Sequence, residues 1–512
     1  MSEPPRGMDI HGVEARAARP SASLMLTRDG DEGVELLLAR RVDELPAFPG
    51  YWAFPGGGVG RVDRSAVELI PLLTQMEDNV EAATHAGMHR ELVEELGFAV
   101  SEKGQLFRVE PALRDRILAD KSEWMKAVLS GDLPLQVDAF IELTRRTTPE
   151  FAPMRFENRF MFMHCTSEVP EPALEGQTEF DEFRWIKPSI ALEEWYGNEI
   201  KIPPPIVTIL QEVVDLQSEF SSMQEIADDI CLRQPPERTI LFAPGVECIP
   251  IPTATLPPAT TTNSYLLGMA GGEHILVDPA VRNEEGIARI SRALQRMSDS
   301  GGTLLAYLFT HRHMDHLGDI DALLALMPAE IWASQETADA LSTGASRILL
   351  DGDIIVLKNP TGSSLWSALI TPGHCPGHVC LNSEAGLVVG DMVAGIGTIL
   401  IPPAEGNMEV YLEQLQRLNN INAHLLFPAH GPVLPLPKKV FKHYLKHRQI
   451  RHDKVLLIVE DGTSSLDEIA LLAYADTPNA HPILARQQTL SHLLSWQRCS
   501  RIDSQDGLWS PL

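Results

Sequence analysis

The stretch that decides the fold reads Leu304-Leu305-Ala306-Tyr307-Leu308-Phe309-Thr310-His311-Arg312-His313-Met314-Asp315-His316. Its first six residues form the apolar run that is typical of a buried strand. Four potential metal ligands then follow within six residues, namely His311, His313, Asp315 and His316. Imidazole and carboxylate groups suit Zn²⁺ or a similar ion. Exposed loop histidines are the alternative, but chance rarely places four such side chains directly after a strand. The stretch therefore predicts a metal site at the end of a strand.

Three more ligand candidates lie downstream, and each follows an apolar run. They are His374 in Thr371–His374, Asp391 after Val388–Gly390, and His430 in Phe427–Pro432. Because each run is strand-like, all three side chains can be delivered to one edge of a sheet. Upstream, Asn263–Leu267 and Ile275–Asp278 have the pattern of opening strands.

These motifs together resemble the metallo-β-lactamase superfamily, over about residues 241–451. The resemblance implies an αββα sandwich that binds two Zn²⁺ ions. It implies a first metal held by His311, His313 and His374. It implies a second metal held by Asp315, His316 and His430, with Asp391 as a bridge and Asp278 orienting the cluster.

The chemistry implied by this resemblance is hydrolysis by a hydroxide that two metal ions activate, with Asp315 steering it or receiving a proton. The same apparatus serves thioesters, phosphodiesters and lactams, so the motif fixes the reaction class and not the substrate. We expect the neighbouring Cys375 to be a loop residue and His378 to stand outside the ligand set, which is complete without it.

A second group of acidic residues lies in Arg90-Glu91-Leu92-Val93-Glu94-Glu95-Leu96-Gly97-Phe98. On a helix, Glu91, Glu94 and Glu95 share one face, since positions i, i+3 and i+4 are neighbours. Three adjacent carboxylates favour a hard divalent cation such as Mg²⁺ or Mn²⁺. The alternative is a solvated acidic face. The glycine-rich turn Phe54–Gly58 upstream favours the cation, because backbone carbonyls can approach closely there.

This combination resembles the Nudix family, whose box ends in the pattern that 90–98 matches. The resemblance implies hydrolysis of a diphosphate linked to another group. It implies metal ligands Glu91, Glu94 and Glu95 with the Gly56 carbonyl, and a catalytic role for Glu94 or Glu95. Two features depart from the family, namely the long stretch from Gly58 to Glu81 and the lack of a mid-box glutamate.

A narrower resemblance is to the coenzyme A diphosphatase-like group of Nudix proteins. It rests on Thr148-Pro149-Glu150, on 155–160 and on Pro203-Pro204-Pro205. A plain amphipathic strand with exposed arginines is the alternative interpretation of the middle segment.

The domain organisation follows from pattern changes along 512 residues, enough for about three domains. The pattern predicts an α/β multidomain chain. We expect a hairpin at 23–39, a helix over 81–96 ended by Gly97, strands at 136–143 and 159–164, and a helix over 205–230. The predicted parts are a flexible leader (1–20), a Nudix α/β/α sandwich (21–212), a helix and linker (213–240), a metallo-β-lactamase domain (241–454) and a winged-helix-like tail (455–512).

The composition indicates the cellular compartment and excludes some classes of binding partner. The formal net charge of −28 argues against coating of nucleic acid duplexes. No apolar run reaches membrane-spanning length, so we expect no membrane partner. The six cysteines are scattered without a C-x-x-C pair, which is typical of a reducing cytoplasm. The sequence does not predict the oligomeric state.

The leading functional hypothesis is a bifunctional hydrolase of small-molecule diphosphate and thioester substrates. The alternative is an endoribonuclease acting on single-stranded RNA, with a Nudix domain that only binds nucleotide. It draws on a locally basic helix whose two stripes are Lys438, Lys442 and Lys446, and Lys439, His443, His447 and Arg451. A third hypothesis is a nucleotide-sensing regulator that uses the winged helix.

Overall fold

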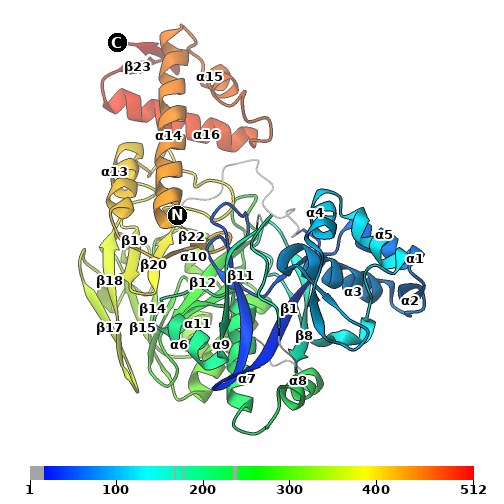
Figure 1. Ribbon diagram of the computed structural model, residues 1–512. Coiled ribbons are helices and arrows are strands. Elements are labelled where there is room, and N and C mark those ends of the chain that lie inside the picture. Colours follow the sequence, from blue (N-terminus) through cyan, green and yellow to red (C-terminus); the bar gives the residue numbers. More distant parts are fainter. Residues whose placement is uncertain (1–15, 167–168, 177–178, 234–238) are drawn as a thin grey trace. The chain divides into compact units, whose positions relative to one another are not determined.

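Two compact units make up the chain. The computed structural model describes residues 16–166, 169–176, 179–233 and 239–512. The N-terminal unit comprises 16–149 and 154–244, and the C-terminal unit comprises 150–153 and 245–512 (Figure 1). Residues 1–15 of the expected leader lie outside the described residues, and Arg19 and Pro20 already belong to the first strand.

A seven-stranded mixed sheet forms the centre of the N-terminal unit. Its order is β3-β2-β1-β8-β7, with β4 beside β1 and β9 beside β2. The predicted hairpin is confirmed as β1–β2, and β1 pairs in parallel with β8. The strands are β1 (Arg19–Gly30), β2 (Gly33–Arg41), β3 (Trp52–Ala53), β4 (Gly56–Gly58), β7 (Ile141–Thr147), β8 (Phe156–Cys165) and β9 (Phe180–Ile186).

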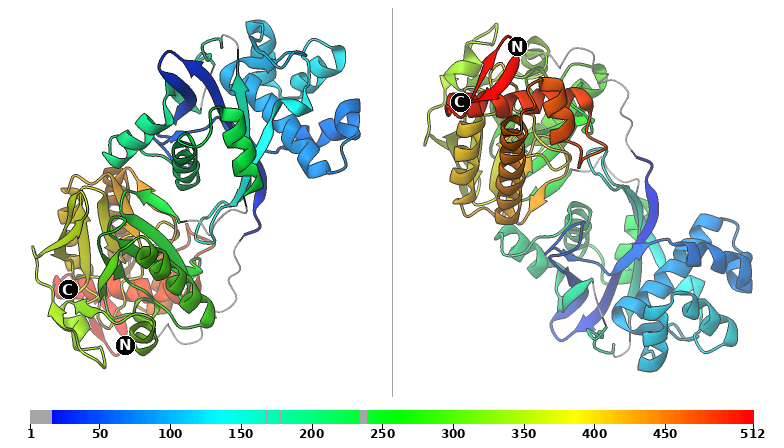
Figure 2. Two further views of the ribbon diagram at one scale, coloured as in Figure 1. Left: turned by 90° about the horizontal axis from the view of Figure 1, so that it is seen from below. Right: turned by 90° about the horizontal axis from the view of Figure 1, so that it is seen from above.

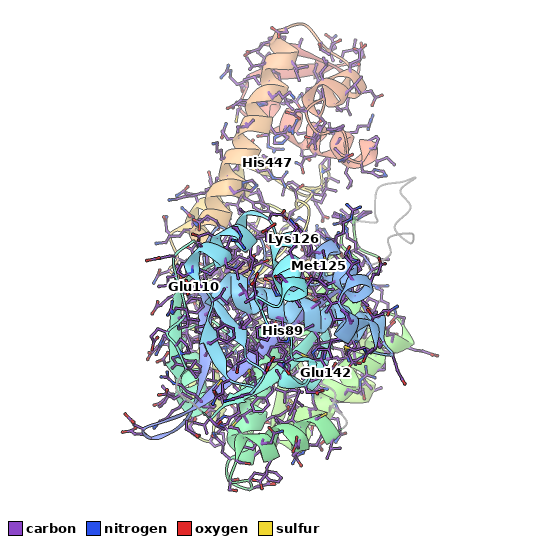
Figure 3. All side chains as sticks on the ribbon, turned by 45° about the vertical axis from the view of Figure 1, so that its right-hand side comes forward. His89, Glu110, Met125, Lys126, Glu142 and His447 are labelled. Atoms are coloured by element: carbon purple, nitrogen blue, oxygen red, sulfur yellow. The ribbon has the colours of Figure 1, made fainter. Side chains whose placement is uncertain are left out.

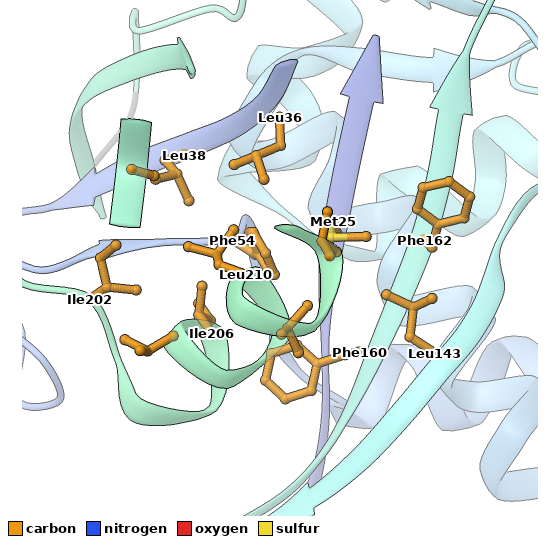
Figure 4. Close-up of a cluster of buried hydrophobic side chains, with 14 of the residues drawn as sticks. Met25, Leu36, Leu38, Phe54, Leu143, Phe160, Phe162, Ile202, Ile206 and Leu210 are labelled. Carbon is orange, nitrogen blue, oxygen red and sulfur yellow. The ribbon is translucent and has the colours of Figure 1, made fainter. Parts of the chain in front are cut away.

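One face of this sheet packs against helices from the end of the unit, α6 (Pro188–Tyr196), α7 (Pro204–Leu216) and α8 (Met223–Leu232). Met25, Leu36 and Leu38 point to this face and contact the apolar side of α7, as Figure 4 shows. The helix predicted over 205–230 is therefore two helices. The break occurs because Ser222 starts α8 with a capping box, in which its hydroxyl accepts from the Glu225 amide.

The opposite face packs against α3 (Asn79–Glu91) and a π-helical turn, η1 (Leu92–Leu96). Leu24 and Leu26, which alternate with Met25 along β1, contact Met88 and Leu92 there. Gly97 ends the turn with a left-handed φ of 73°, as predicted. The sheet thus lies between two helical layers.

A separate apolar cluster surrounds the outer side of α3. It gathers α1 (Arg61–Leu69), α2 (Pro71–Thr74), α4 (Pro111–Ala119), α5 (Ser122–Ser130) and a two-stranded sheet, β5 (Phe98–Val100) with β6 (Leu106–Arg108). The strand predicted at 136–143 is wrong at its start: η2 (Val137–Ala139) is a 3₁₀ turn. The turn arises because Val137 packs into this cluster whereas Ala139 packs into the one on the sheet.

Two sheets build the C-terminal unit, and each has six strands within the unit. The short strand β10 (Leu241–Ala243) precedes the first of them in the chain. The first has β11 (Val246–Pro252), β12 (Thr261–Leu267), β13 (Glu273–Val277), β14 (Thr303–Leu308), β15 (Glu330–Ala333) and β16 (Arg347–Ile348) in that order. The second has β17 (Ile354–Asn359), β18 (Gly362–Ile370), β19 (Val379–Ser383), β20 (Gly386–Gly390), β21 (Leu425–Pro428) and β22 (Leu434–Pro435).

The two sheets of this unit face each other, with helices on their outer sides. Tyr265 of β12 meets Phe427 of β21 edge to face at 5.7 Å. The helices α9 (Glu284–Asp299) and α11 (Ile320–Leu326) cover the first sheet, and α13 (Met408–Asn419) and α14 (Pro437–Glu460) cover the second. This is the expected αββα arrangement. Short helices α10 (Met314–Leu317) and α12 (Gln335–Ala338) lie in its loops.

The end of the chain packs on the second half of α14. It consists of α15 (Leu466–Ala473), α16 (Pro482–Arg498) and a hairpin of β23 (Ile502–Gln505) and β24 (Leu508–Pro511). Figure 2 shows α14 and α16 side by side. Helix, helix and short wing occur in the predicted order, and the winged-helix assignment itself stays a prediction.

In the described ranges of the chain, no helix combines the length and the apolarity that a lipid bilayer requires.

Candidate metal centre and a second acidic site

The predicted ligands come together in the C-terminal unit, and each follows a strand. The loop after β14 carries His311 and His313, and α10 carries Asp315 and His316. The other three, His374, Asp391 and His430, come after β18, β20 and β21. The expectation that His374, Asp391 and His430 lie at one edge of a sheet is confirmed, because β18, β20 and β21 run in the same direction in the second sheet. Two sheets contribute, because their packed faces bring both sets of strand ends together.

Three histidine nitrogens of the predicted first site converge on one point. The Nε2 of His311 lies 3.0 Å from Nδ1 of His313, and Nε2 of His374 lies 2.9 Å from the same Nδ1. Neighbouring ligands of a tetrahedral zinc at 2.0–2.1 Å stand roughly 3.4 Å apart. All three side chains are buried. The spacing suits a single shared cation.

Asp391 lies between the two predicted sites. Its Oδ2 is 3.4 Å from Nε2 of His374, in the first group. Its Oδ1 is 3.6 Å from Nε2 of His316 and 3.4 Å from Nε2 of His430. Asp315 joins the same second group, with Oδ2 3.5 Å from His430. One carboxylate oxygen thus faces each group, as a bridging ligand requires.

Backbone carbonyls fix the tautomers of two of these histidines. The Nδ1 of His374 is 2.9 Å from the Leu400 carbonyl, and Nδ1 of His430 is 3.0 Å from the Thr261 carbonyl. Because a carbonyl only accepts, each Nδ1 carries the proton and donates it. The lone pair of each Nε2 therefore points into the cluster, where a cation can use it.

Asp278 fixes two more histidines. Its Oδ2 lies 2.9 Å from Nδ1 of His316 and accepts from the Thr310 hydroxyl at 2.6 Å. With its hydroxyl proton committed, Thr310 accepts from Nδ1 of His311 at 3.0 Å. Asp278 itself has φ of 45°, a left-handed conformation that is uncommon outside glycine. Both histidines thus present Nε2 lone pairs inward.

Glu405 orients the metal-ligand candidate His313, and the sequence analysis did not identify it. Its Oε1 lies 2.7 Å from Nε2 of His313, which leaves Nδ1 of that ring for the cluster. Its Oε2 accepts from the Arg312 guanidinium at 2.6 Å. Glu405 stands 92 residues after His313 in an irregular loop. No local spacing could have indicated it.

Cys375 and His378 flank His374 in different ways. The Cys375 thiol lies in a loop, as predicted, but it is fully buried beside the three histidines of the first group. Burial, with the nearby Glu405 carboxylate, raises its pKa well above the usual range. His378 accepts from the Asp391 amide at Nε2 (3.1 Å) and so donates from Nδ1 to Thr371 (2.9 Å). His378 therefore positions the backbone of Asp391.

The charges in the cluster favour a cation. Burial and the adjacent His313 lower the pKa of His374 to about 4, so it is neutral at neutral pH. Burial also acts to lower the pKa of His316, but Asp278, Asp391 and Asp315 together raise it to about 10. A proton at His316 thus stands where positive charge is needed, and a metal ion would replace it.

Two buried polar atoms provide an independent test of this fit. Neither Nε2 of His316 nor Oδ1 of Asp391 has a hydrogen-bond partner among the described residues. Buried polar atoms in folded proteins are nearly always paired, because desolvation is otherwise uncompensated. Both are ordinary metal-binding atoms, and they face each other. The residues present therefore fit a metal ion.

A large pocket opens over this cluster. It has a volume of about 1390 Å³ and reaches from His313, Asp315 and His374 to the end of the chain. Leu484 and Leu490 of α16 line its far side. Other apolar lining residues are Leu256, Pro258, Ile396, Leu400 and Pro402. Figure 3 labels His447, which lies on the wall that α14 contributes.

The αββα sandwich, the histidine and aspartate cluster and the pocket define a metal-dependent hydrolase. A sequence profile of the Metallo-beta-lactamase superfamily matches residues 257–430. The Lactamase-like protein aptB of Emericella nidulans is 31% identical over 229 residues, which cover 42% of this chain and 69% of that protein. The chain therefore belongs to the metallo-β-lactamase superfamily.

Two further similarities concern parts of the chain. The Atrochrysone carboxyl ACP thioesterase of Aspergillus fumigatus is 26% identical over 203 residues, which cover 39% of this chain and 60% of that protein. The crystal structure of a NUDIX hydrolase from Alicyclobacillus acidocaldarius is 23% identical, with a TM-score of 0.35, and covers 39% of this chain and 92% of that one.

In the N-terminal unit, the three predicted carboxylates are buried on one turn but engage different partners. Glu95 accepts from the Gly56 amide at 2.7 Å, and Glu94 pairs with Lys121 and Arg90, both at 2.9 Å. The π-helical turn over 92–96 explains the divergence, because it shifts the i, i+3, i+4 register that an α-helix would keep. Within the described residues, the close ligand groups do not include this trio.

The glycine-rich turn contacts this acidic turn through its backbone. A Cβ added to Gly57 would lie 2.4 Å from Oε1 of Glu91, so a larger residue at this position would displace that carboxylate. The Gly56 amide faces Glu95, whereas the prediction concerned its carbonyl as a ligand. The turn thus binds Glu95 directly and lies against Glu91.

Asp63 supplies the acidic partner that the sequence did not reveal. It is fully buried, and it accepts from Nε and Nη2 of Arg90 at 2.8 and 2.9 Å. The Gly60 amide also donates to it, at 2.6 Å. The long segment between Gly58 and Glu81 contains Asp63 at the start of α1, so an aspartate binds Arg90 although the sequence offers no mid-box glutamate.

We expect the metal-free N-terminal unit to lose stability as pH rises. Burial, followed by the charge of Glu94, raises the pKa of Glu91 to about 7, against about 4.5 in the unfolded chain. A carboxyl group whose pKa is higher in the folded than in the unfolded chain stabilises the folded state most when the pH is below its unfolded pKa. This stabilisation is lost as the pH rises from the unfolded pKa to the folded pKa. Between pH 4 and 8 Glu91 alone should account for a loss of about 3 kcal/mol, from 1.4 kcal/mol per pH unit.

Urea denaturation of the full chain in chelator, followed by hydrogen exchange of peptides from α3, measures this loss. Glu91→Gln should remove the part of the pH dependence that Glu91 contributes and leave the part from Glu95, whose pKa is also raised, whereas Glu68→Gln, at an exposed position of α1, should retain both parts. Parallel pH profiles for both variants would contradict the prediction.

Proposed function

We propose that the C-terminal unit hydrolyses acyl thioesters with two zinc ions. The observation that carries this proposal is Asp391, whose two oxygens face two separate histidine groups. The pocket supports the choice of substrate, because its apolar lining suits an acyl chain and its volume exceeds the usual 300–1,000 Å³ of small-molecule sites. A relative named as a thioesterase points to the same class.

Zinc ions bound by these residues would supply an activated water as nucleophile and positive charge for the developing oxyanion. The chain's own residues orient this chemistry. Asp278, Glu405 and the Leu400 carbonyl hold the rings of His316, His313 and His374. Despite its burial, Asp315 keeps a lowered pKa beside His316 and His430, so its carboxylate stays ionised and would bind a cation.

For the N-terminal unit we propose hydrolysis of a diphosphate linkage in a coenzyme A-like or nucleotide substrate. Glu91, Glu94 and Glu95 would hold Mg²⁺ or Mn²⁺, which polarises the phosphoryl oxygens. The support is the buried acidic turn, where two carboxyl pKa values are raised by burial. A cation would relieve that cost and would replace the Lys121 contact of Glu94.

One experiment with crossed variants tests both proposals. The full chain is assayed with Zn²⁺ on an acyl-coenzyme A thioester, and with Mg²⁺ on coenzyme A and ADP-ribose. His374→Ala should abolish only thioester hydrolysis, and Glu95→Gln should abolish only diphosphate hydrolysis. Each variant is thus the control for the other.

Single-stranded RNA serves as the competing substrate in the same experiment. Cleavage of RNA that Asp315→Ala removes, without thioester hydrolysis, would replace the first proposal by the endoribonuclease alternative. The endoribonuclease alternative drew on two basic stripes of α14, and the stripe that ends at Arg451 is shorter than predicted. Arg451 is buried and pairs with Asp476 at 2.9 Å, whereas Lys438, Lys442 and Lys446 are exposed.

A further inference from the structure

We infer that the C-terminal helices position the metal ligand His374 by clamping the segment Ile399–Ile401 from its outer side. The inner side of this segment presents the Leu400 carbonyl, which accepts from Nδ1 of His374. The residues that hold the outer side are Gln488 and Ser491 of α16 and Arg448 of α14. They are positioning residues, since they act on His374 through the segment.

Gln488 and Ser491 bind both polar groups of one residue. The Ile401 amide donates to Oε1 of Gln488 at 3.1 Å. The Ile401 carbonyl accepts from the Ser491 hydroxyl at 2.5 Å, a shorter contact than the alternative acceptor, the Gln487 carbonyl at 3.1 Å. Gln488 and Ser491 are 5% and 4% exposed, so water cannot readily take their place. The helix thereby pairs with Ile401 as a neighbouring strand would.

Arg448 binds the same segment at Ile399, two residues before Ile401. Its buried guanidinium donates to the Ile399 carbonyl. It also lies 5.7 Å from the ring of Tyr411, whose hydroxyl donates to the Met392 carbonyl next to Asp391. Two different helices therefore hold the segment, one on each side of Leu400.

The segment needs such partners because it lies outside regular structure. It belongs to the irregular stretch between β20 and α13. Within the described part of the chain, no backbone-to-backbone hydrogen bond involves residues 399–401. Buried peptide groups without partners cost about 1–3 kcal/mol each. The contacts from α14 and α16 therefore determine where the Leu400 carbonyl lies.

The consequence concerns metal affinity. The Leu400 carbonyl is the acceptor for the Nδ1 proton of His374, so its position sets the direction of the Nε2 lone pair. Removing a partner that orients a histidine ligand typically lowers metal affinity by about 10–100-fold. Gly373, the neighbour of His374, packs closely against the backbone of Tyr411, because an added Cβ there would lie 2.4 Å from it.

The test measures metal binding by the full chain, and it rests on the proposed zinc centre. Zinc affinity is determined by competition with a chromophoric chelator, and the ligand geometry by the visible spectrum of the Co²⁺-loaded protein. Gln488→Ala with Ser491→Ala should weaken binding of one zinc by about 10–100-fold and change the Co²⁺ spectrum. Gln497→Ala is the matched control, since its amide on the same helix contacts Asp503.

Conservative variants separate positioning from folding. Ser491→Thr keeps the hydroxyl and Gln488→Glu keeps the accepting oxygen, so both should bind zinc like the wild type. If the double variant fails to fold, the comparison of Ser491→Ala with Ser491→Thr decides. Unchanged affinity and spectrum in a folded alanine variant would overturn the clamp alone. A wild-type protein that binds no zinc would overturn the metal centre itself.

Discussion

Replacing Asp391 by alanine should release zinc from the C-terminal unit and lower its hydrolytic rate by at least about 10²–10³-fold, the loss typical of one preorganised stabilising group. The reason is that Asp391 faces both histidine groups, at 3.4 Å from His374 and 3.4 Å from His430. Its loss also removes negative charge from a cluster of five histidines. Zinc content by elemental analysis and the thioester assay measure the two effects.

The control for this prediction is Asp321→Ala, an exposed aspartate on α11 of the same unit. It should keep both zinc content and rate. A variant at Asp391 that retains two zinc ions per chain would show that the carboxylate does not bridge, and a retained rate would remove it from the site.

Replacing Asp63 by alanine should destabilise the N-terminal unit by about 3–5 kcal/mol, the usual cost of leaving one partner of a buried ion pair alone. Asp63 is fully buried and Arg90 is 2% exposed, so neither charge has access to water. The Gly60 amide loses its acceptor as well. Urea denaturation at neutral pH, with hydrogen exchange to follow this unit, measures the change.

The matched control is Asp132→Ala, an exposed aspartate that contacts Ser130. It should change stability by less than about 0.5 kcal/mol, as exposed sites usually do. A loss below 1 kcal/mol at Asp63 would mean that Glu91 and Glu94, which also pair with Arg90, compensate for the missing carboxylate.

The seven predicted ligands of the metal centre could be recognised in the sequence because they follow four strands, with four of the ligands after β14 and one after each of β18, β20 and β21. A strand and the loop that follows it form a local pattern, and the αββα layers then bring the strand ends together. The sheet order could not be anticipated in detail. The pairing of strands that are distant in the sequence depends on the packing of whole layers. No local sequence pattern predicts that packing.

The residues that hold those ligands escaped sequence analysis for the same reason. Glu405, Gln488 and Ser491 act across 92, 87 and 90 residues of chain. Asp63 of α1 reaches Arg90 of α3 across 27 residues and one intervening helix, α2. The acidic turn shows a different limit, since the π-helical turn alters a helical face that the spacing of Glu91, Glu94 and Glu95 predicts.

The parallel pairing of β1 with β8 has a consequence for biosynthesis. The two strands lie side by side in the middle of the N-terminal sheet, yet Ser21 and Asn158 are 137 residues apart. At about 5–20 residues per second, a ribosome needs on the order of ten seconds to produce that interval. During this time the nascent β1–β2 hairpin has an unpaired edge open to aggregation. Chaperone capture of the emerging chain, ending once β8 has left the exit tunnel, is the behaviour this topology favours.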